Sequence, residues 1–242
     1  MSAVPAVAVD EAVALPALRF SPPNEKMVKT GKVLGTRIQS FNLPALKSQR
    51  DGFTTCPGAG VCASICYARQ GWYYRPVVRD LREDNLVALR GMNIDEMVEA
   101  IDAGIKDLHH MVGIVRIHDS GDFFSREYMW AWFAVMERNP HLRFYAYTKM
   151  VPFFVDLILP PNFLLMYSEG GKWDAQIPPD APRSRIFVTH EEREAAGFVD
   201  GTSSDGDLPV LMGERRVGLV YHGSNDLKPG QMLALRREPA LL

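Results

Sequence analysis

All three cysteines of the chain lie within one short segment, Cys56-Pro-Gly-Ala-Gly-Val-Cys62-Ala-Ser-Ile-Cys66. Cysteine thiolates bind zinc and the irons of iron–sulfur clusters, and each of these metals takes four ligands. Three cysteines therefore leave one position of a tetrahedral zinc, or one iron of a four-iron cluster, without a cysteine ligand. The segment predicts a metal centre whose open position can bind a substrate or a cofactor.

A structural zinc site and a disulfide are alternatives for the same cysteines. In a zinc site, an acidic residue or a histidine such as His118 or His222 would be the fourth ligand. A disulfide would leave one odd thiol, and buried free thiols are a third interpretation. Residues 1–20 contain neither the basic region nor the long apolar region of a secretory signal, so we expect a cytoplasmic protein. Thiols stay reduced in the cytoplasm, which favours metal binding over a disulfide.

The composition is that of one ordinary globular domain, with 242 residues of which 47% are hydrophobic and 23% charged. We expect a flexible N-terminal arm over residues 1–25 and a single α/β domain over residues 26–242. The net charge of −2 excludes a chain that is basic throughout, so any nucleic-acid binding must come from a local patch. No stretch is apolar for long enough to predict a membrane span.

Hydrophobic patterns predict strands that alternate with helices. Such alternation is typical of βαβ units and a mostly parallel sheet, whose right-handed crossovers curl it toward an incomplete (β/α) barrel. The run 201–207, rich in Gly, Ser and Asp, predicts a mobile loop. The expected strands are 33–42, 113–118, 142–148, 163–168, 186–189, 210–212 and 217–221. The expected helices are 75–90, one that Asn93 caps, 125–138, 152–159 and 191–196.

Polar or glycine-bearing segments follow each of the first four predicted strands. The cysteine segment follows the first strand, and the segments after the next three are Asp119-Ser120-Gly121-Asp122, Thr148-Lys149 and Ser168-Glu169-Gly170-Gly171. In parallel barrels and open α/β sheets, sites form at the carboxyl ends of the strands. We therefore expect these four segments to line one opening at the carboxyl ends of the strands, which we call the mouth.

This arrangement resembles the radical S-adenosylmethionine (SAM) enzymes over about residues 33–190. The resemblance implies a radical-SAM-like incomplete barrel, a 4Fe-4S cluster on Cys56, Cys62 and Cys66, and SAM on the fourth iron. It implies that Ser120, Gly121 and Asp122 contact the methionyl group of SAM. Further candidate cofactor contacts at later strand ends are Thr148, Ser168 and Glu169. The cysteines here are separated by five and three residues, whereas the usual family loop has three and two.

Two other resemblances involve the same segments. The stretches Cys-Pro-Gly-Ala, Cys-Tyr-Ala, Ser-Gly-Asp-Phe and Tyr-Thr-Lys are similar to an uncharacterised gene-product family of actinobacterial phages, and this similarity covers most of the chain. The segment Asp119-Ser120-Gly121, with Phe123, resembles the Asp-Ser-Gly segment of tRNA-guanine transglycosylases. That second resemblance implies a base-exchange enzyme in which Asp119 and Asp122 act on the base.

Basic residues indicate a way in which a substrate can be bound. Arg75, Arg79 and Arg82 share a face of the predicted helix and lie near aromatic residues, a combination that suits a nucleic acid or another phosphate-bearing substrate. A solvated helix face with salt bridges is the alternative. Lys149 is a further catalytic candidate, because it could meet a carboxylate or a phosphate. We expect an iron–sulfur enzyme that acts on a small molecule, nucleobase or nucleic acid; the alternative is a zinc-stabilised nucleic-acid- or protein-binding module without catalysis.

Overall fold

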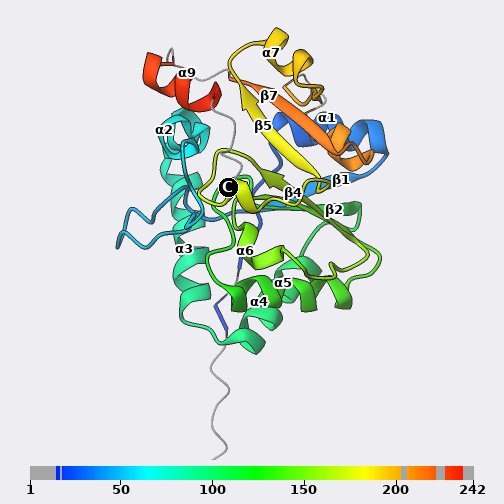
Figure 1. Ribbon diagram of the computed structural model, residues 1–242. Helices are drawn as coiled ribbons and strands as arrows, with labels where there is room; N and C mark the ends of the chain where they lie inside the picture. Colours follow the sequence, from blue (N-terminus) through cyan, green and yellow to red (C-terminus); the bar gives the residue numbers. More distant parts are fainter. Residues whose placement is uncertain (1–14, 17, 203–205, 222–226, 237–242) are drawn as a thin grey trace, which may run out of the picture.

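The computed structural model describes residues 15–16, 18–202, 206–221 and 227–236. Their central feature is one parallel sheet of seven strands in the order β1-β2-β3-β4-β5-β7-β6. The sheet curls into a half-barrel (Figure 1). The α/β class and the incomplete parallel barrel are therefore confirmed. The strands are β1 (Arg37–Phe41), β2 (Val112–Ile117), β3 (Arg143–Thr148), β4 (Phe163–Ser168), β5 (Arg183–Phe187), β6 (Val199–Asp200) and β7 (Arg216–Val220).

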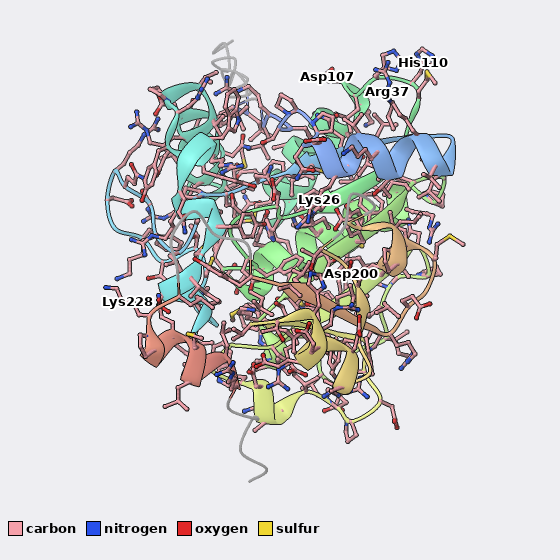
Figure 2. The ribbon with its side chains drawn as sticks, turned by 90° about the horizontal axis from the view of Figure 1, so that it is seen from above. Lys26, Arg37, Asp107, His110, Asp200 and Lys228 are labelled. Atoms are coloured by element: carbon pink, nitrogen blue, oxygen red, sulfur yellow. The ribbon has the colours of Figure 1, made fainter. Side chains whose placement is uncertain are left out.

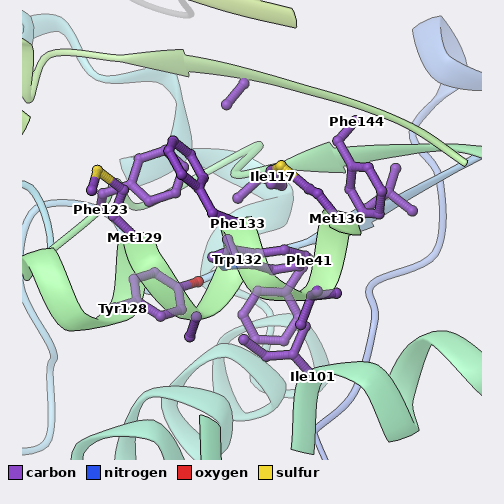
Figure 3. Close-up of a cluster of buried hydrophobic side chains, with 14 of the residues drawn as sticks. Phe41, Ile101, Ile117, Phe123, Tyr128, Met129, Trp132, Phe133, Met136 and Phe144 are labelled. Carbon is purple, nitrogen blue, oxygen red and sulfur yellow. The ribbon is translucent and has the colours of Figure 1, made fainter. Parts of the chain in front are cut away.

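The outer face of the sheet is covered by the longer helices α3 (Pro76–Arg90), α4 (Ile94–Lys106) and α5 (Arg126–Arg138). Alternate residues of β1 to β4 point toward them, because successive side chains of a strand face opposite sides. Trp132 of α5 is fully buried at the centre of this core, edge-to-face against Phe41 and Phe144 (Figure 3). Aromatic packing of this kind fixes α5 firmly on the sheet.

Two of these helices begin where their capping residues predicted. The Asn93 side chain accepts from the Glu96 amide at 3.0 Å, and Glu96 accepts from the Asn93 amide at 2.8 Å, so α4 opens with a complete capping box. The Ser125 hydroxyl accepts from the Tyr128 amide at 3.1 Å at the start of α5. Both helix starts are local signals, which explains why the sequence alone locates them.

The inner face of the half-barrel is covered by α1 (Glu25–Leu34) and α8 (Leu208–Leu211). Met27 of α1 is fully buried there, in a cluster with apolar side chains from strands at both sides of the sheet, including Ile38 of β1 and Val217 of β7. Strands so far apart can share one cluster only because the sheet curls. Seen from above, Lys26 of α1 also lies over this interior (Figure 2).

One predicted strand, 210–212, is wrong, and two others, 33–42 and 186–189, are wrong in part, because β5 spans Arg183–Phe187. Val33 and Leu34 belong to helix α1, which Asn24 caps and which ends at Gly35 in a left-handed conformation, so β1 begins only at Arg37. The predicted strand 210–212 is instead helix α8 and its end, with Pro209 in the first turn. In both places a short apolar run fits a helix as well as a strand.

The remaining elements are short. They include a two-residue strand, β6, and the C-terminal helix α9, neither of which the sequence patterns predicted. Short helices form because their ends are held by the surrounding fold rather than by intrinsic propensity. They are α2 (Cys62–Ile65), α6 (Val151–Phe154), α7 (His190–Ala195), α9 (Pro229–Arg236) and the 3₁₀ turns η1 (Tyr67–Arg69), η2 (Gly71–Tyr74) and η3 (Asp174–Gln176).

The chain joins the folded core before the predicted end of the N-terminal arm at residue 25. Leu18 is buried, and the Arg19 backbone exchanges two hydrogen bonds with the Asn85 side chain, at 2.9 and 2.8 Å. The Ser21 amide donates to the Ser40 carbonyl at 2.8 Å. The part of the arm from residue 18 onward is thus packed against α3 and β1. Among the described residues, no helix is both long and apolar enough to cross a bilayer.

Candidate functional site

Hydrogen bonds tie the four predicted strand-end segments to one another. After β2, the Asp122 amide donates to the Thr55 carbonyl of the cysteine-bearing loop at 3.1 Å. The Asp122 carboxylate accepts from the Lys149 amide after β3 at 2.9 Å. The Lys149 ammonium in turn donates to the Ser168 hydroxyl at the end of β4 at 2.6 Å. The structure therefore brings these segments together at the carboxyl edge of the sheet.

The cysteine loop is docked directly on the loop that follows β4. The Cys62 amide donates to the Gly170 carbonyl at 3.4 Å, and the Lys172 amide donates to the Gly58 carbonyl at 2.9 Å. A Cβ at Gly58 would lie 2.4 Å from the Lys149 carbonyl oxygen, and one at Gly60 would lie 2.6 Å from the Gly170 carbonyl oxygen. These glycines are therefore required by the close approach of two backbones.

The three thiols are partly buried neighbours. Burial raises the pKa of Cys56 to about 12, and the Asp122 carboxylate and Cys66 add to this rise. Burial also raises the pKa of Cys66, assisted by Cys62 and opposed by the Ala68 amide. The Leu46 amide lies 3.4 Å from the Cys56 sulfur as a donor. In the part of the chain that the structure describes, no three His, Cys, Asp or Glu side chains are grouped so as to hold a metal ion.

Asp122 is a buried crosslink at the centre of the mouth. One carboxylate oxygen accepts from the Thr148 hydroxyl at 2.7 Å and from the Phe123 amide at 2.8 Å. The other accepts from the Lys149 amide at 2.9 Å. Burial raises the pKa of Asp122, and these three donors oppose the rise. Asp122 therefore joins the ends of β2 and β3, and its carboxylate is already engaged by the protein.

Other predicted site residues are also held by contacts within the protein. The Ser120 hydroxyl donates to the Leu43 carbonyl at 2.6 Å. Gly121 has a φ of +85°, and a Cβ there would lie 2.6 Å from the Leu43 side chain. The Thr148 hydroxyl accepts from the Met150 amide at 2.9 Å. The Ser120-Gly121 turn is thereby packed on the chain that leaves β1.

Lys149 and Glu169 form the next part of the mouth. The Lys149 ammonium donates to the Ser168 hydroxyl and to the carbonyls of Ser168 and Glu169, at 2.6, 2.9 and 2.9 Å. The buried Glu169 carboxylate lies 3.7 Å from the Arg183 guanidinium and 3.6 Å from that of Arg185. Burial raises the pKa of Glu169, against the effect of both arginines. Each of these side chains binds neighbouring strand ends.

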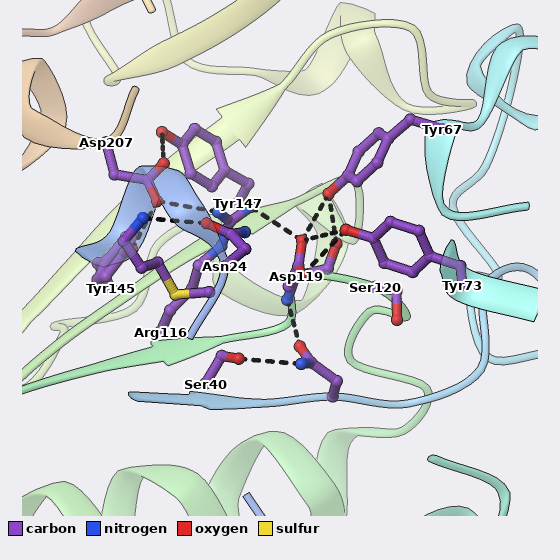
Figure 4. Close-up of polar contacts among 12 residues, drawn as sticks. Asn24, Ser40, Tyr67, Tyr73, Arg116, Asp119, Ser120, Tyr145, Tyr147 and Asp207 are labelled. Carbon is purple, nitrogen blue, oxygen red and sulfur yellow. Dashed lines mark hydrogen bonds and ion pairs between the residues drawn. The ribbon is translucent and has the colours of Figure 1, made fainter. Parts of the chain in front are cut away.

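Asp119 accepts hydrogen bonds from two tyrosines on the 3₁₀ turns η1 and η2, which follow the cysteine loop. The Tyr67 hydroxyl contacts the Asp119 carbonyl and lies 3.0 Å from the carboxylate, and the Tyr73 hydroxyl lies 3.1 Å from both carboxylate oxygens (Figure 4). Burial raises the pKa of Tyr73, and the Asp119 charge adds to this. Both tyrosines therefore reach it as neutral donors.

The interior of the half-barrel contains a buried ion pair that the sequence patterns did not reveal. Arg116 of β2 donates to Asp207 at 2.9 Å, and Asp207 also accepts from the hydroxyls of Tyr145 at 2.8 Å and Tyr147 at 3.3 Å (Figure 4). Asp207 is the last residue of the predicted loop 201–207, yet it is buried. An available signal was Arg116, a charged residue inside an otherwise apolar strand.

A cavity of about 630 Å³ opens beside the cysteine loop. It is bounded by the chain after β1, the cysteine loop and the start of α3. Arg79 and Arg82 line it, but Arg75 precedes α3 and stacks on Trp72 at 4.1 Å, outside the lining. The three arginines therefore do not share one face, because α3 begins only at Pro76. The cationic and aromatic side chains of the lining are Lys47, Arg69, Tyr73, Tyr74, Arg79, Arg82 and Lys172.

The histidine proposed as a zinc ligand is engaged elsewhere. His118 is buried, its Nε2 shares a hydrogen bond with the Tyr128 hydroxyl at 2.9 Å, and its ring lies edge-on to Phe123. Burial, with the Arg116 charge, lowers the pKa of His118 to about 3. It is thus a neutral residue of the core between β2 and α5. His222 lies outside the described residues.

Comparison with protein families confirms the predicted phage gene-product relationship. A family model described as "Gene product 88" matches residues 17–227, which is most of the chain. The chain belongs to the Gene product 88 family. Its relatives include the "Gene 88 protein" of Mycobacterium phage L5, 35% identical over 131 residues, and that of Mycobacterium phage D29, 33% identical over 131 residues.

The similarity to these Gene 88 proteins is partial in length. Each alignment covers 51% of this chain, and 53% and 52% of the L5 and D29 proteins, respectively. The chain thus spans about half the length of the curated relatives it matches. No solved structure gives a significant match. The half-barrel and its mouth are therefore the basis for inferring what the protein does.

Proposed function

We propose that this chain is a radical-SAM-like iron–sulfur enzyme in which Cys56, Cys62 and Cys66 hold a four-iron cluster and SAM binds the remaining iron. The position of the thiols carries the proposal. They lie on the loop after β1, at the carboxyl edge of a parallel half-barrel, where the ends of β2, β3 and β4 also meet. Sites of parallel α/β barrels form at this edge.

The thiols have neighbouring groups of the kind that surround the cysteine ligands of iron–sulfur clusters. Thiolates of iron–sulfur clusters accept backbone N–H hydrogen bonds, which also tune the reduction potential. Leu46 provides such a donor to Cys56, and Ala68 provides one to Cys66. Cluster binding would require the three sulfurs to draw closer than they lie in this structure.

The roles of the chain's own residues follow from their contacts. When bound, the cluster and SAM supply the electron transfer and the radical that removes a substrate hydrogen. Asp122 and Lys149 keep the ends of β2, β3 and β4 in register around the thiols. Because the side chains of Ser120 and Asp122 are engaged by the protein, they position the mouth. The substrate would enter through the cavity beside Cys56.

The test is metal analysis of protein purified without oxygen. Iron, acid-labile sulfide and zinc are measured per chain, together with the visible absorption spectrum. We expect about four irons and a broad visible band, both lost in Cys62→Ala. Ser64→Ala is the matched control on the same loop, because its exposed hydroxyl bonds only the Val61 carbonyl among the described residues. It should retain the iron.

Two results would overturn the proposal. One zinc per chain without iron would indicate the zinc-stabilised binding module instead. Protein that contains neither metal after reconstitution with iron and sulfide would remove the metal centre altogether. If iron is present, SAM cleavage by the reduced protein is measured next. An iron-containing protein that never cleaves SAM would contradict the enzyme assignment while leaving the cluster in place.

A further inference from the structure

Arg82 is a buried cation without a close partner. Only 5% of the residue is exposed, and among the described contacts it donates no hydrogen bond. Its Nε has no acceptor, and the nearest carboxylate oxygen, on Asp119, is 4.0 Å away. That carboxylate already accepts from Tyr67 and Tyr73. Burying a guanidinium without a bonded anion costs free energy, and binding of another anion would offset this cost.

The cavity beside the cysteine loop is where such an anion would bind. Arg82 is in its lining together with four other cationic residues, Lys47, Arg69, Arg79 and Lys172. Glu83 is the single acidic residue of the lining. Its carboxylate does not face Arg82 as a partner, because it accepts from the Ser48 hydroxyl and the Gln49 amide, both at 2.7 Å. The lining therefore has an excess of positive charge, although one of its cations, Arg79, is paired with Asp80 outside the lining at 2.9 Å.

The cavity also has the size and the aromatic wall of a small-molecule site. Its volume of about 630 Å³ lies within the range of ordinary ligand pockets. The Tyr73 ring stacks on the Arg82 guanidinium, 4.5 Å from centroid to carbon, and fixes its plane. Tyr74, about half exposed, lines the same cavity and offers a face for a flat ring.

We propose that this cavity binds a phosphate-bearing ligand, with Arg82 at its base and Lys47 and Arg79 toward solvent. Arginine suits phosphate because its planar fork donates two parallel hydrogen bonds, and several cations are needed for a multiply charged group. The phosphate can belong to a free nucleotide or to a nucleic-acid strand. Cys56 also lines this cavity, so the site adjoins the proposed metal centre, but binding of a phosphate group to its cations does not require the cluster.

The test is calorimetric titration of the purified full chain with four probes. ATP and inorganic triphosphate present the charge, adenosine presents the base and ribose without phosphate, and a short single-stranded DNA presents phosphodiesters. We expect ATP and triphosphate to bind and adenosine not to bind. ATP binding stronger than that of the DNA would identify a nucleotide as the source of the phosphate, and the reverse order would identify a strand. No detectable binding of ATP, triphosphate or DNA would overturn the proposal.

Variants locate the site. Arg82→Lys keeps the charge but loses the fork, and we expect it to weaken ATP binding about tenfold. Because a buried substitution can impair folding, the double variant Lys47→Ala/Arg79→Ala removes two cations near the surface and should weaken binding at least as much. The matched control, Lys32→Ala/Arg75→Ala, removes equal charge outside the cavity lining. Equal weakening by both double variants would show non-specific attraction and overturn the proposal.

The same titration separates this site from the metal centre. Cys62 does not line the cavity. Cys62→Ala should therefore lose the metal and still bind ATP, whereas Lys47→Ala/Arg79→Ala should keep the metal and bind ATP weakly. Cys62→Ala tests the metal centre, and Lys47→Ala/Arg79→Ala tests the phosphate site. Either proposal can therefore fail while the other is still tested. If Cys62→Ala folds normally but loses ATP binding, the phosphate site is not separate.

Discussion

At the scale of single residues, the carboxylate of Asp122 joins the end of β2 to the end of β3 through two of its three hydrogen bonds. It accepts from Thr148, the Phe123 amide and the Lys149 amide while fully enclosed. Asparagine has the same shape, but its amide nitrogen cannot accept a hydrogen bond. Because its oxygens already accept these hydrogen bonds, the Asp122 carboxylate primarily stabilises the structure of the mouth.

Asp122→Asn should therefore lower the free energy of unfolding by about 1–3 kcal/mol, the cost of leaving one buried donor unpaired. The measurement is urea unfolding followed by circular dichroism. Asp107→Asn, at the exposed end of α4, is the control and should change stability by less than about 0.5 kcal/mol. Equal effects of the two substitutions would show that Asp122 is not a structural crosslink.

His118 makes stability depend on pH in a defined direction. Its pKa is lowered to about 3 in the folded protein, mainly by burial, whereas an unfolded histidine titrates near 6.5. Between these values the unfolded chain binds the additional proton. The stabilising effect is therefore complete above about pH 6.5 and is lost as the pH falls toward 3, by up to about 1.4 kcal/mol per pH unit.

Urea unfolding of the wild type at several values between pH 7 and pH 4.5 checks this slope. His118→Gln removes the titrating group and should show a shallower loss of stability on acidification. His141→Gln changes an exposed histidine and should behave as the wild type. If the slope of His118→Gln matches that of the wild type, another group is responsible for the acid sensitivity.

At the scale of elements, the cysteine loop depends on contacts with the loops after β3 and β4. Gly58 lies where any Cβ would overlap the Lys149 carbonyl, at 2.4 Å. Gly58→Ala should therefore displace the loop and lower stability by about 1–3 kcal/mol. The thermal unfolding midpoint measures this loss.

Gly91→Ala is the control for that substitution. Gly91 ends α3 with a φ of −87°, and its nearest neighbour atom would lie 3.5 Å from an added Cβ, so alanine fits there. We expect no loss of stability in this variant. If Gly58→Ala is equally harmless, the loop is not docked as closely as the contacts indicate. The comparison of these two variants tests how the cysteine loop is docked, and it leaves all three cysteines unchanged.

At the scale of the whole molecule, the ion pair between Arg116 and Asp207 holds α8 inside the half-barrel. The pair is buried, and two tyrosine hydroxyls complete the acceptor positions of the aspartate. Removing the negative charge would leave an arginine enclosed without its partner. Such a loss is far more costly than the net contribution of an intact pair.

Asp207→Asn should therefore lower the free energy of unfolding by about 3–5 kcal/mol. Asp180→Asn, on an exposed turn, should have an effect below about 0.5 kcal/mol. Both are measured by urea unfolding at pH 7. A loss near that of the control would mean that Arg116 finds another partner or water, and that the ion pair does not hold the interior together.

The sequence by itself determined the local features of this protein. The caps at Asn93 and Ser125, the position of β4 and the four strand-end segments are local patterns, readable because their signals lie within a few residues of one another. The alternation of strands and helices also determined a parallel, curled sheet. Family membership followed from the same short segments.

Only the tertiary structure decided which distant side chains meet. Arg116 and Asp207 are 91 residues apart in the chain, and the curl of the sheet places them in contact. Tertiary packing also leaves Arg82 buried beside a cavity, whereas Arg75 lies outside the cavity lining because α3 begins only at Pro76. Burial and partner choice depend on the whole fold, so no local pattern can reveal them.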